Sequence, residues 1–209
     1  VFTVPSRELA EQLTAVAAQL ITFSDTEIIL EKCIGGTDKK RQVAKLTQTQ
    51  PHIVIGTPGR IFDLMQENAL FVQTVQMMVV DEADMTFDLG FLETVDEIAS
   101  RMPENLQMSV FSATIPDKIK PFLKKYLGNP KVIQIENTQL VSPTIKNQLL
   151  VTKAQDPMDV LRQLLVMGHP YLVLIFVNTK QKADEVTKDL RSHNFKVATI
   201  HGDIPSRER

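Results

Sequence analysis

Val75-Gln76-Met77-Met78-Val79-Val80-Asp81-Glu82-Ala83-Asp84 is the stretch that decides the fold of this chain and points to its chemistry. A mostly apolar run of strand length ends here in two adjacent carboxylates. In open α/β sheets, ligands bind at the carboxyl edge of the strands. In nucleotide hydrolases, an acidic residue at this position holds the Mg²⁺ that bridges the phosphates. The stretch therefore predicts phosphoryl chemistry at a sheet edge.

The two carboxylates are predicted to have different roles. Asp81 would hold Mg²⁺ through water, because Mg²⁺ prefers hard oxygen ligands and keeps several of its waters. Glu82 would polarise the water that attacks a terminal phosphate in line. In the alternative interpretation, Asp81 and Asp84 only cap the helix that follows. Asp84 can also cap that helix and bond across the site.

Bulk composition sets limits on the function. The 209 residues are enough for one large domain, or for one domain and part of another. A formal net charge of −2 gives no general basic field, so a nucleic acid would have to be bound by local donors. The single Cys33 excludes an internal disulfide. We see neither a signal peptide nor an apolar stretch of membrane length, so we expect a cytoplasmic protein with no membrane partner.

Short β-rich runs alternate with amphipathic helical segments along the whole chain. This rhythm predicts βαβ units and an α/β fold with a parallel sheet flanked by helices. Helices are expected from Leu9, capped by Ser6, at 87–98, near 159–167 and at 181–192. The expected strands are 1–4, 28–34, 53–55, 77–80, 108–111 and 132–135, and then 145–151, 171–177 and 196–200.

Two domains are expected, because periodicity is lost in the middle of the chain. Residues 1–136 would form the first domain, 137–144 a polar linker, and 145–209 the start of the second domain. The chain opens inside an apparent strand without an initiator Met and stops in a charged run. We therefore expect an internal fragment, with the first domain nearly complete and the second truncated.

Several strand ends are suited to binding phosphate. Pro5-Ser6-Arg7 and Thr57-Pro58-Gly59-Arg60 each follow a strand and begin a helix, where unpaired N–H groups favour anions. Gly35-Gly36, after a third strand, permits close backbone approach. Each alone is more often a plain turn or helix start, but together they predict a track along a phosphate backbone. Asn178-Thr179-Lys180 and His201-Gly202-Asp203 follow strands expected in the second part.

Ser112-Ala113-Thr114 follows the strand expected at 108–111, about thirty residues after the acidic stretch. One strand–helix–strand unit fits that gap, so both motifs should meet at one edge of the sheet. Hydroxyls beside a carboxylate can sense the state of a phosphate. The alternative is a helix cap ahead of Pro116.

The whole set, in this order along the chain, resembles a DEAD-box ATP-dependent RNA helicase of the bacterial cold-shock type. The motifs are Pro5–Ala10, Gly35-Gly36, Thr57–Arg60, Asp81–Asp84, Ser112–Thr114, Ile175–Lys180 and His201–Asp203. The resemblance covers essentially the whole chain. It implies two RecA-like domains that close on ATP, Mg²⁺ and RNA, bend the RNA and open short duplexes locally.

The resemblance also implies roles residue by residue. Asp81 and Glu82 would bind nucleotide through Mg²⁺ and water, while Asp84, Ser112 and Thr114 would couple hydrolysis to domain closure. Single-stranded or short duplex RNA would be held mainly by its sugar-phosphate backbone, with low sequence selectivity. The RNA-binding residues would be Pro5, Arg7, Gly36, Thr57, Gly59 and Arg60 in the first domain and Thr179, Gly202 and Arg209 in the second.

The chain departs from the family pattern in identifiable places. A phosphate-binding Gly-x-x-x-x-Gly-Lys-Ser/Thr loop and the Gln segment that reads adenine are absent, and would lie before Val1. The arginine-finger motif would lie after Arg209. Ser206 stands where the family usually has Gln, Met85 where Arg is common, and Ser6 where Thr is usual. We therefore expect the intact protein, and not this fragment, to hydrolyse ATP.

Two other functions remain open on the sequence. One is an ATP-gated clamp that holds partners on RNA with little unwinding. The other is a DNA-directed motor on the same fold.

Overall fold

The computed structural model describes residues 1–135, 145–152 and 156–204. The chain divides into two compact units, Val1–Gln134 and Ile135–Arg209. The linker expected at 137–144, together with Ser206 and Arg209, lies outside the described residues. No helix in the described ranges is long and apolar enough to cross a membrane.

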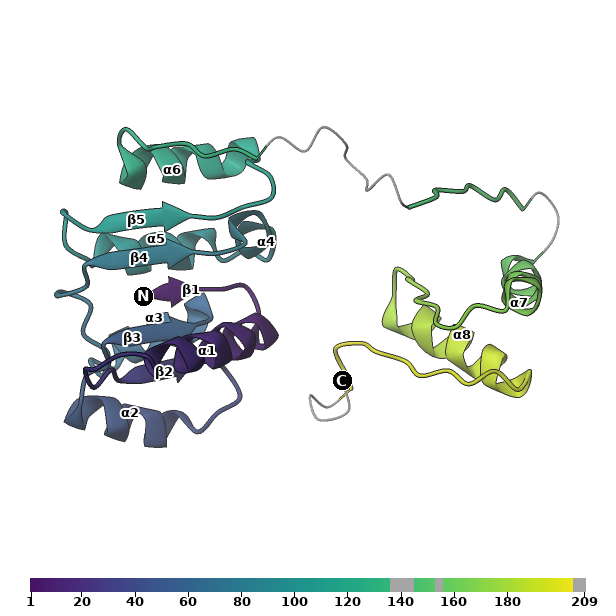
Figure 1. Cartoon of the computed structure of the whole chain (residues 1–209), viewed down its shortest axis with the longest axis horizontal. Coiled ribbons are helices and arrows are strands. Elements are labelled where there is room, and N and C mark those ends of the chain that lie inside the picture. Colours follow the sequence, from purple (N-terminus) through teal and green to yellow (C-terminus); the bar gives the residue numbers. More distant parts are fainter. Residues whose placement is uncertain (136–144, 153–155, 205–209) are drawn as a thin grey trace. The chain divides into compact units, whose positions relative to one another are not determined.

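The first unit is built on a five-stranded parallel sheet (Figure 1). Its order is β2-β3-β1-β4-β5, with β1 pairing β3 through Phe2↔Ile55 and β4 through Phe2↔Val79. Because every pairing is parallel, all the carboxyl ends meet at one edge. The first five expected strands and the α/β fold are therefore confirmed. The strands are β1 (Phe2–Thr3), β2 (Leu30–Cys33), β3 (Ile53–Gly56), β4 (Met77–Val80) and β5 (Gln107–Val110).

Helices cover both faces of this sheet, with α1 on one face and α3 and α5 on the other (Figure 1). As expected, Ser6 caps α1, because its Oγ accepts the N–H of Leu9 at 3.1 Å. The helices of this unit are α1 (Arg7–Ile21), α2 (Lys39–Gln48), α3 (Pro58–Gln66), α4 (Ala83–Asp88), α5 (Leu92–Ser100), the short 3₁₀ helix η1 (Asp117–Ile119) and α6 (Lys120–Leu127).

Two apolar clusters hold these layers together. Val4, Ile34 and Ile55 pack against the inward face of α1. The helix expected from Leu9 is confirmed, although Val16 and Leu20 of its expected apolar stripe are exposed. The larger cluster joins the opposite face of the sheet to α2, α3, α5 and α6, with Ile61 and Ile98 fully buried. The sheet is therefore fixed from both sides beneath the edge where its strands end.

The continuous helix expected at 87–98 is wrong. Phe91 N bonds back to Thr86 O at 3.1 Å, and the chain turns there between α4 and α5. Phe87 and Val95 are both buried, so the apolar spacing correctly marks the inward face of two helices. Periodicity reports which side is buried but does not detect a break that preserves the spacing.

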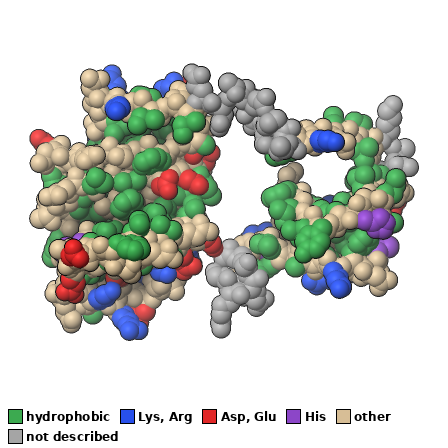
Figure 2. Space-filling view, in the orientation of Figure 1, with side chains coloured by type: hydrophobic (Ala, Val, Ile, Leu, Met, Phe, Trp, Pro, Cys, Tyr) green, Lys and Arg blue, Asp and Glu red, His purple; other side chains and the backbone are tan. Residues whose placement is uncertain are grey.

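In the second unit the helices agree with expectation and the strands do not. The two helices are α7 (Pro157–Gly168) and α8 (Lys180–Ser192). No strand forms at 145–151, 171–177 or 196–200, nor at 132–135, where the first unit ends. Leu172 is 77% and Phe176 89% exposed, and Figure 2 shows hydrophobic side chains exposed on this unit. A strand exists only when a neighbour completes its ladder, and no described segment pairs with these runs.

Gly56 at the end of β3 gives a prediction about stability. A Cβ at Gly56 would lie 2.1 Å from the carbonyl oxygen of Cys33, which is backbone and cannot move aside. We expect Gly56→Ala to lower the free energy of unfolding by about 3 kcal/mol or more. Gly59→Ala is the matched control, because nothing lies within 4 Å of its Cβ position. Urea unfolding measures both; equal midpoints would contradict the packing described.

Candidate functional site

Asp81 and Glu82 lie where β4 leaves the sheet, and both are partly buried. The N–H of Asp81 donates to Thr3 O at 3.0 Å, so it continues the pairing of β4 with β1. Asp81 Oδ1 accepts the N–H of Glu82 at 2.9 Å. Glu82 has φ 45° and ψ 55°, the left-handed region that non-glycine residues rarely adopt. Backbone strain of this kind is concentrated at functional sites.

Asp84 bridges the ends of two neighbouring strands. Its Oδ2 accepts the Oγ1 hydroxyl of Thr114 at 2.8 Å and the Thr114 N–H at 2.9 Å. The N–H of Asp84 donates to Ser112 Oγ at 3.1 Å. Hydrogen bonding from Thr114 lowers the pKa of Asp84 below its ordinary value, so the carboxylate is ionised at neutral pH. The exits of β4 and β5 therefore meet, as the sequence predicted.

Helix capping does not explain these side chains. The residue at the start of α4 is Glu82, and no side chain caps that helix end. Asp84 Oδ1 does accept the N–H of Met85 at 3.0 Å, but its other oxygen reaches across to Thr114. Ser112 donates to Thr114 O instead of capping η1, which begins after Pro116 without a side-chain cap. The acidic and hydroxyl motifs are joined to each other.

The donor set at this edge fits a bound Mg²⁺. No group of three metal-ligating side chains occurs within the described ranges. Mg²⁺ does not need one, because it is usually held by one or two carboxylates together with waters and substrate phosphates. Asp81 and Glu82 supply that number of carboxylates at the carboxyl edge of the sheet.

Arg7, at the start of α1, lies against the turn that follows β2. A Cβ on Gly36 would lie 2.8 Å from Arg7 Nη1, and one on Gly35 would lie 3.1 Å from Nη2. Gly36 also has φ +84°, so both its backbone conformation and the close approach of Arg7 favour glycine at this position. Arg7 is exposed and has no hydrogen-bond or ion-pair partner among the described residues. Its guanidinium is therefore available to an anion at this edge. Pro5, two residues earlier, is buried.

The Thr57–Arg60 motif begins α3 beside the same turn. Thr57 N donates to Cys33 O at 3.0 Å, and Gly59 has open space where a side chain would be. Arg60 is different, because it is only 9% exposed. Its Nη1 donates to Thr37 Oγ1 at 3.0 Å and to Gln42 Oε1 at 2.9 Å, and its Nη2 donates to Thr37 O at 3.1 Å.

Glu31 and Gln42, which share a buried hydrogen-bond network with Arg60, were not predicted from the sequence. Gln42 Nε2 donates to Glu31 Oε1 and to Lys32 O, each at 2.8 Å, and Glu31 and Gln42 are both 8% exposed. Each had a signal: Glu31 lies two residues before the buried Cys33, on the same face of β2, and Gln42 precedes the buried Leu46 by one helical turn. Polar residues at inward positions are informative because they must be paired there.

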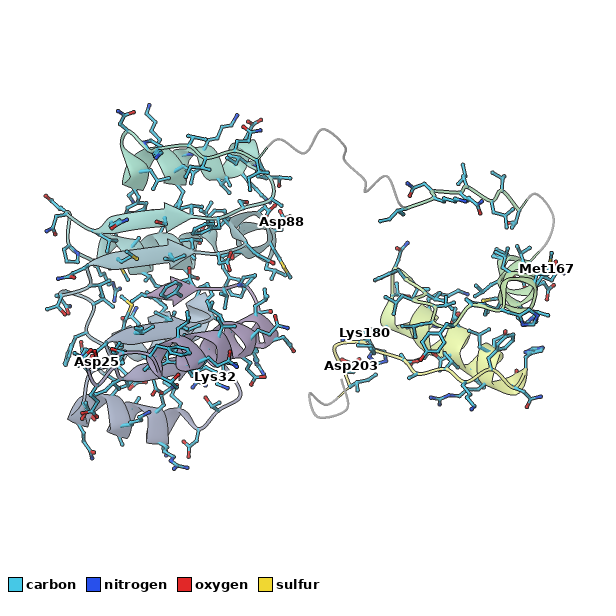
Figure 3. The ribbon with its side chains drawn as sticks, in the orientation of Figure 1. Asp25, Lys32, Asp88, Met167, Lys180 and Asp203 are labelled. Atoms are coloured by element: carbon cyan, nitrogen blue, oxygen red, sulfur yellow. The ribbon has the colours of Figure 1, made fainter. Side chains whose placement is uncertain are left out.

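The second unit has its own turn at a helix start. Thr179 Oγ1 caps α8 by accepting the N–H of Lys182 at 3.1 Å. Lys180 pairs with Asp203, which lies next to it in Figure 3, and this contact lowers the pKa of Asp203. His201 Nε2 lies 3.1 Å from Asp184 Oδ1 and fixes the other side of the turn. Gly202 is thereby held beside Lys180, while Arg209 lies outside the described residues.

A parallel sheet with carboxylates, hydroxyls and helix-start turns along its carboxyl edge is typical of α/β proteins that bind nucleotides. Comparison with known proteins makes the class specific. The family model described as DEAD/DEAH box helicase matches residues 1–122, and that for the helicase conserved C-terminal domain matches residues 156–209. The chain belongs to the DEAD/DEAH box helicase family, which confirms the family expected from its motifs.

Relatives and solved structures agree with this assignment. The chain is 50% identical over 209 residues to the DEAD-box ATP-dependent RNA helicase CshB of Listeria monocytogenes, covering 100% of this chain and 48% of that protein. It is 46% identical over 210 residues to CshB of Bacillus subtilis, with the same coverages. The chain therefore spans about half the length of the curated relatives it matches.

Among solved structures, S. cerevisiae Dbp5 bound to RNA and ADP BeF3 matches with a TM-score of 0.79 and 28% identity, over 100% of this chain and 52% of that one. A DEAD box protein from the hyperthermophile Methanococcus jannaschii matches with a TM-score of 0.58 and 29% identity, over 99% of this chain and 55% of that one. These likenesses identify the described sheet as RecA-like.

Cys33 gives a prediction about pH and reactivity. Burial, aided by nearby Glu31, raises the pKa of the Cys33 thiol to about 12. Because an unfolded thiol ionises near pH 8.5, the thiolate fraction of native Cys33 at pH 8 is about 10³-fold lower. We expect iodoacetamide to react with Cys33 in urea but very slowly in buffer. Stability contributed by the protonated thiol should be complete below about pH 8.5 and decline above it. Equal alkylation rates with and without urea would contradict this burial.

Proposed function

We propose that the protein is an ATP-dependent RNA helicase, in which this chain supplies the water-handling end of the ATPase site and much of the RNA track. The observation that carries the proposal is the bridge from Asp84 to Ser112 and Thr114, next to Asp81 and Glu82. The bridge ties the carboxylate pair of β4 to the hydroxyls of β5. ATP-dependent RNA helicase activity in the named relatives supports the same function.

In this proposal the two carboxylates divide the hydrolytic work. Asp81 would hold Mg²⁺ through water, and the ion would neutralise charge on the phosphates of ATP. Glu82 would orient and polarise the attacking water. The left-handed backbone of Glu82 supports this role. Glutamate adopts this conformation at a higher energetic cost than Gly or Asn, so its presence here favours a role for its side chain.

The Asp84 bridge would couple hydrolysis to RNA. Its three hydrogen bonds join the ends of two strands. A movement of the ATP phosphates would therefore displace Ser112 and Thr114. The two bonds to Thr114 are exposed, and exposed polar contacts contribute little to stability. A contact of small energy can rearrange readily during a catalytic cycle.

RNA would be held by its backbone in a track along the carboxyl edge of the sheet. Pro5, Arg7, Gly36, Thr57, Gly59 and Arg60 would belong to the part of the track formed by residues 1–136, and Thr179, Gly202 and Arg209 to the part in 145–209. The exposed guanidinium of Arg7 and the open space at Gly59 support this placement. Contacts to phosphate carry no sequence information, and the 2′-hydroxyl would distinguish RNA from DNA.

The two alternatives are less well supported. A DNA-directed motor is not favoured, because the relatives are named RNA helicases. An RNA clamp would share every contact described, and strand displacement separates it from a helicase. A duplex-release assay with a short RNA duplex therefore distinguishes the clamp from the helicase.

Glu82→Gln tests the proposed chemistry. The substitution keeps size and hydrogen bonding but removes the base, so we expect ATP hydrolysis to fall by about 10²-fold or more while RNA binding in the presence of ATP persists. RNA-stimulated phosphate release and RNA duplex release are the measurements. Glu93→Gln, an exposed glutamate on α5, is the matched control. A Glu82→Gln protein with normal hydrolysis would refute the assignment.

Arg7→Ala tests the RNA track. If Arg7 contacts a phosphate, its loss should weaken single-stranded RNA binding and reduce the slope of log affinity against log salt by about one. Fluorescence anisotropy over a salt series measures both the affinity and the slope. The control is Arg101→Ala, because the Arg101 guanidinium lies over the ring of Phe62. An unchanged salt slope would remove Arg7 from the track.

A further inference from the structure

The turn from Gly35 to Thr37 is held from below by a chain of buried polar side chains. Arg60 grips Thr37 twice, at its carbonyl oxygen and at its hydroxyl. The Thr37 hydroxyl in turn donates to Ile34 O at 2.9 Å, which closes the turn over the two glycines. The exposed Arg7, at the start of α1, lies against the two glycines of this turn.

Gln42 joins the charges beneath this turn. Its carbonyl oxygen accepts from Arg60, and its amide N–H₂ donates to Glu31. Buried charges require compensation, and here the Gln42 amide links the Arg60 guanidinium to the Glu31 carboxylate. Lys45 at the rim completes the set with a 2.5 Å contact to Glu31 Oε2. No buried side-chain polar atom of the described residues lacks a partner, so this network is fully satisfied.

Arg60 is placed as a support for the turn and not as a phosphate ligand. Three hydrogen bonds to Thr37 and Gln42 already engage its guanidinium, and 91% of the residue is covered, since only 9% is exposed. Contact with a phosphate would require breaking bonds inside a low-dielectric network. Arg7, by contrast, is exposed and lies against the same turn.

We propose that Glu31, Gln42 and Arg60 are positioning residues that fix the Gly35–Thr37 turn, and through it Arg7, in the geometry that grips an RNA phosphate. The inference rests on the proposed function and deepens it. It moves Arg60 from the set that touches RNA to the set that supports it, and adds Glu31 and Gln42. RNA affinity would thus depend on side chains that RNA never reaches.

Gln42→Met in the intact protein is the decisive variant, because it preserves length while removing the hydrogen bonds of the amide with Arg60, Glu31 and Lys32. We expect it to raise the RNA concentration that half-saturates ATPase stimulation by about ten-fold, comparable to the loss of one charged hydrogen bond. Turnover at saturating RNA should not change, because the nucleotide residues are not touched. Gln48→Met, an exposed glutamine on the same helix, should behave as the unmodified protein.

A double-mutant cycle separates positioning from simple loss of stability. If Gln42 acts through Arg7, then Arg7→Ala combined with Gln42→Met should bind RNA no more weakly than Arg7→Ala alone. Additive losses, or a Gln42→Met protein with normal half-saturation, would overturn the inference. Arg60→Met should likewise add no further loss of salt slope in the Arg7→Ala background; a loss of about one more would make Arg60 a phosphate ligand.

Two controls keep the outcome interpretable. Should Gln42→Met fail to unfold cooperatively, Thr37→Val takes its place, because Thr37 is exposed and the change removes only the hydroxyl. It should raise the half-saturating RNA concentration several-fold, and no change would count against the inference. An unmodified intact protein without RNA-stimulated ATPase would refute the proposed function itself. Normal stimulation with an unaffected Gln42→Met would refute only the positioning network.

Discussion

Parallel pairing of β1 with both β3 and β4 is the constraint on which the rest of the structure depends. Phe2 is opposite Ile55 on one side and Val79 on the other, so this two-residue strand sets the register of the sheet. Asp81 continues the same ladder by donating to Thr3 O. Because parallel strands end at a common edge, three phosphate-type turns and the acidic stretch become neighbours although they are far apart in the sequence.

The elements predictable from sequence were those whose signal is local. The run at 77–80 ends in a sharp change from apolar to acidic residues, and Ser6 precedes the apolar stripe of α1 that it caps. The segments at 171–177 and 196–200 have an equally clear apolar pattern, yet form no strand. Their state depends on a partner strand, and periodicity reports only which residues favour burial.

Much the same division applies to the candidate site. The carboxylates and hydroxyls at Asp81, Glu82, Ser112 and Thr114 could be found because each follows a recognisable strand. Glu31 and Gln42 could not be assigned a partner in this way, because they are eleven residues apart and meet only when α2 packs on β2. Arg60 was found, but its motif gave no indication that its donors face inward. The direction of a long side chain is a property of its three-dimensional surroundings.

The left-handed backbone at Glu82 has a consequence for how this chain can change over time. A left-handed residue with a side chain costs about 1 kcal/mol or more, and glycine or asparagine would relieve much of that cost. Selection for folding stability alone would therefore favour replacement of glutamate at this position. Retaining a carboxylate there requires continuous selection for what the side chain does. Relaxed lineages of the same fold would be expected to lose that glutamate early, while keeping the buried strand in front of it.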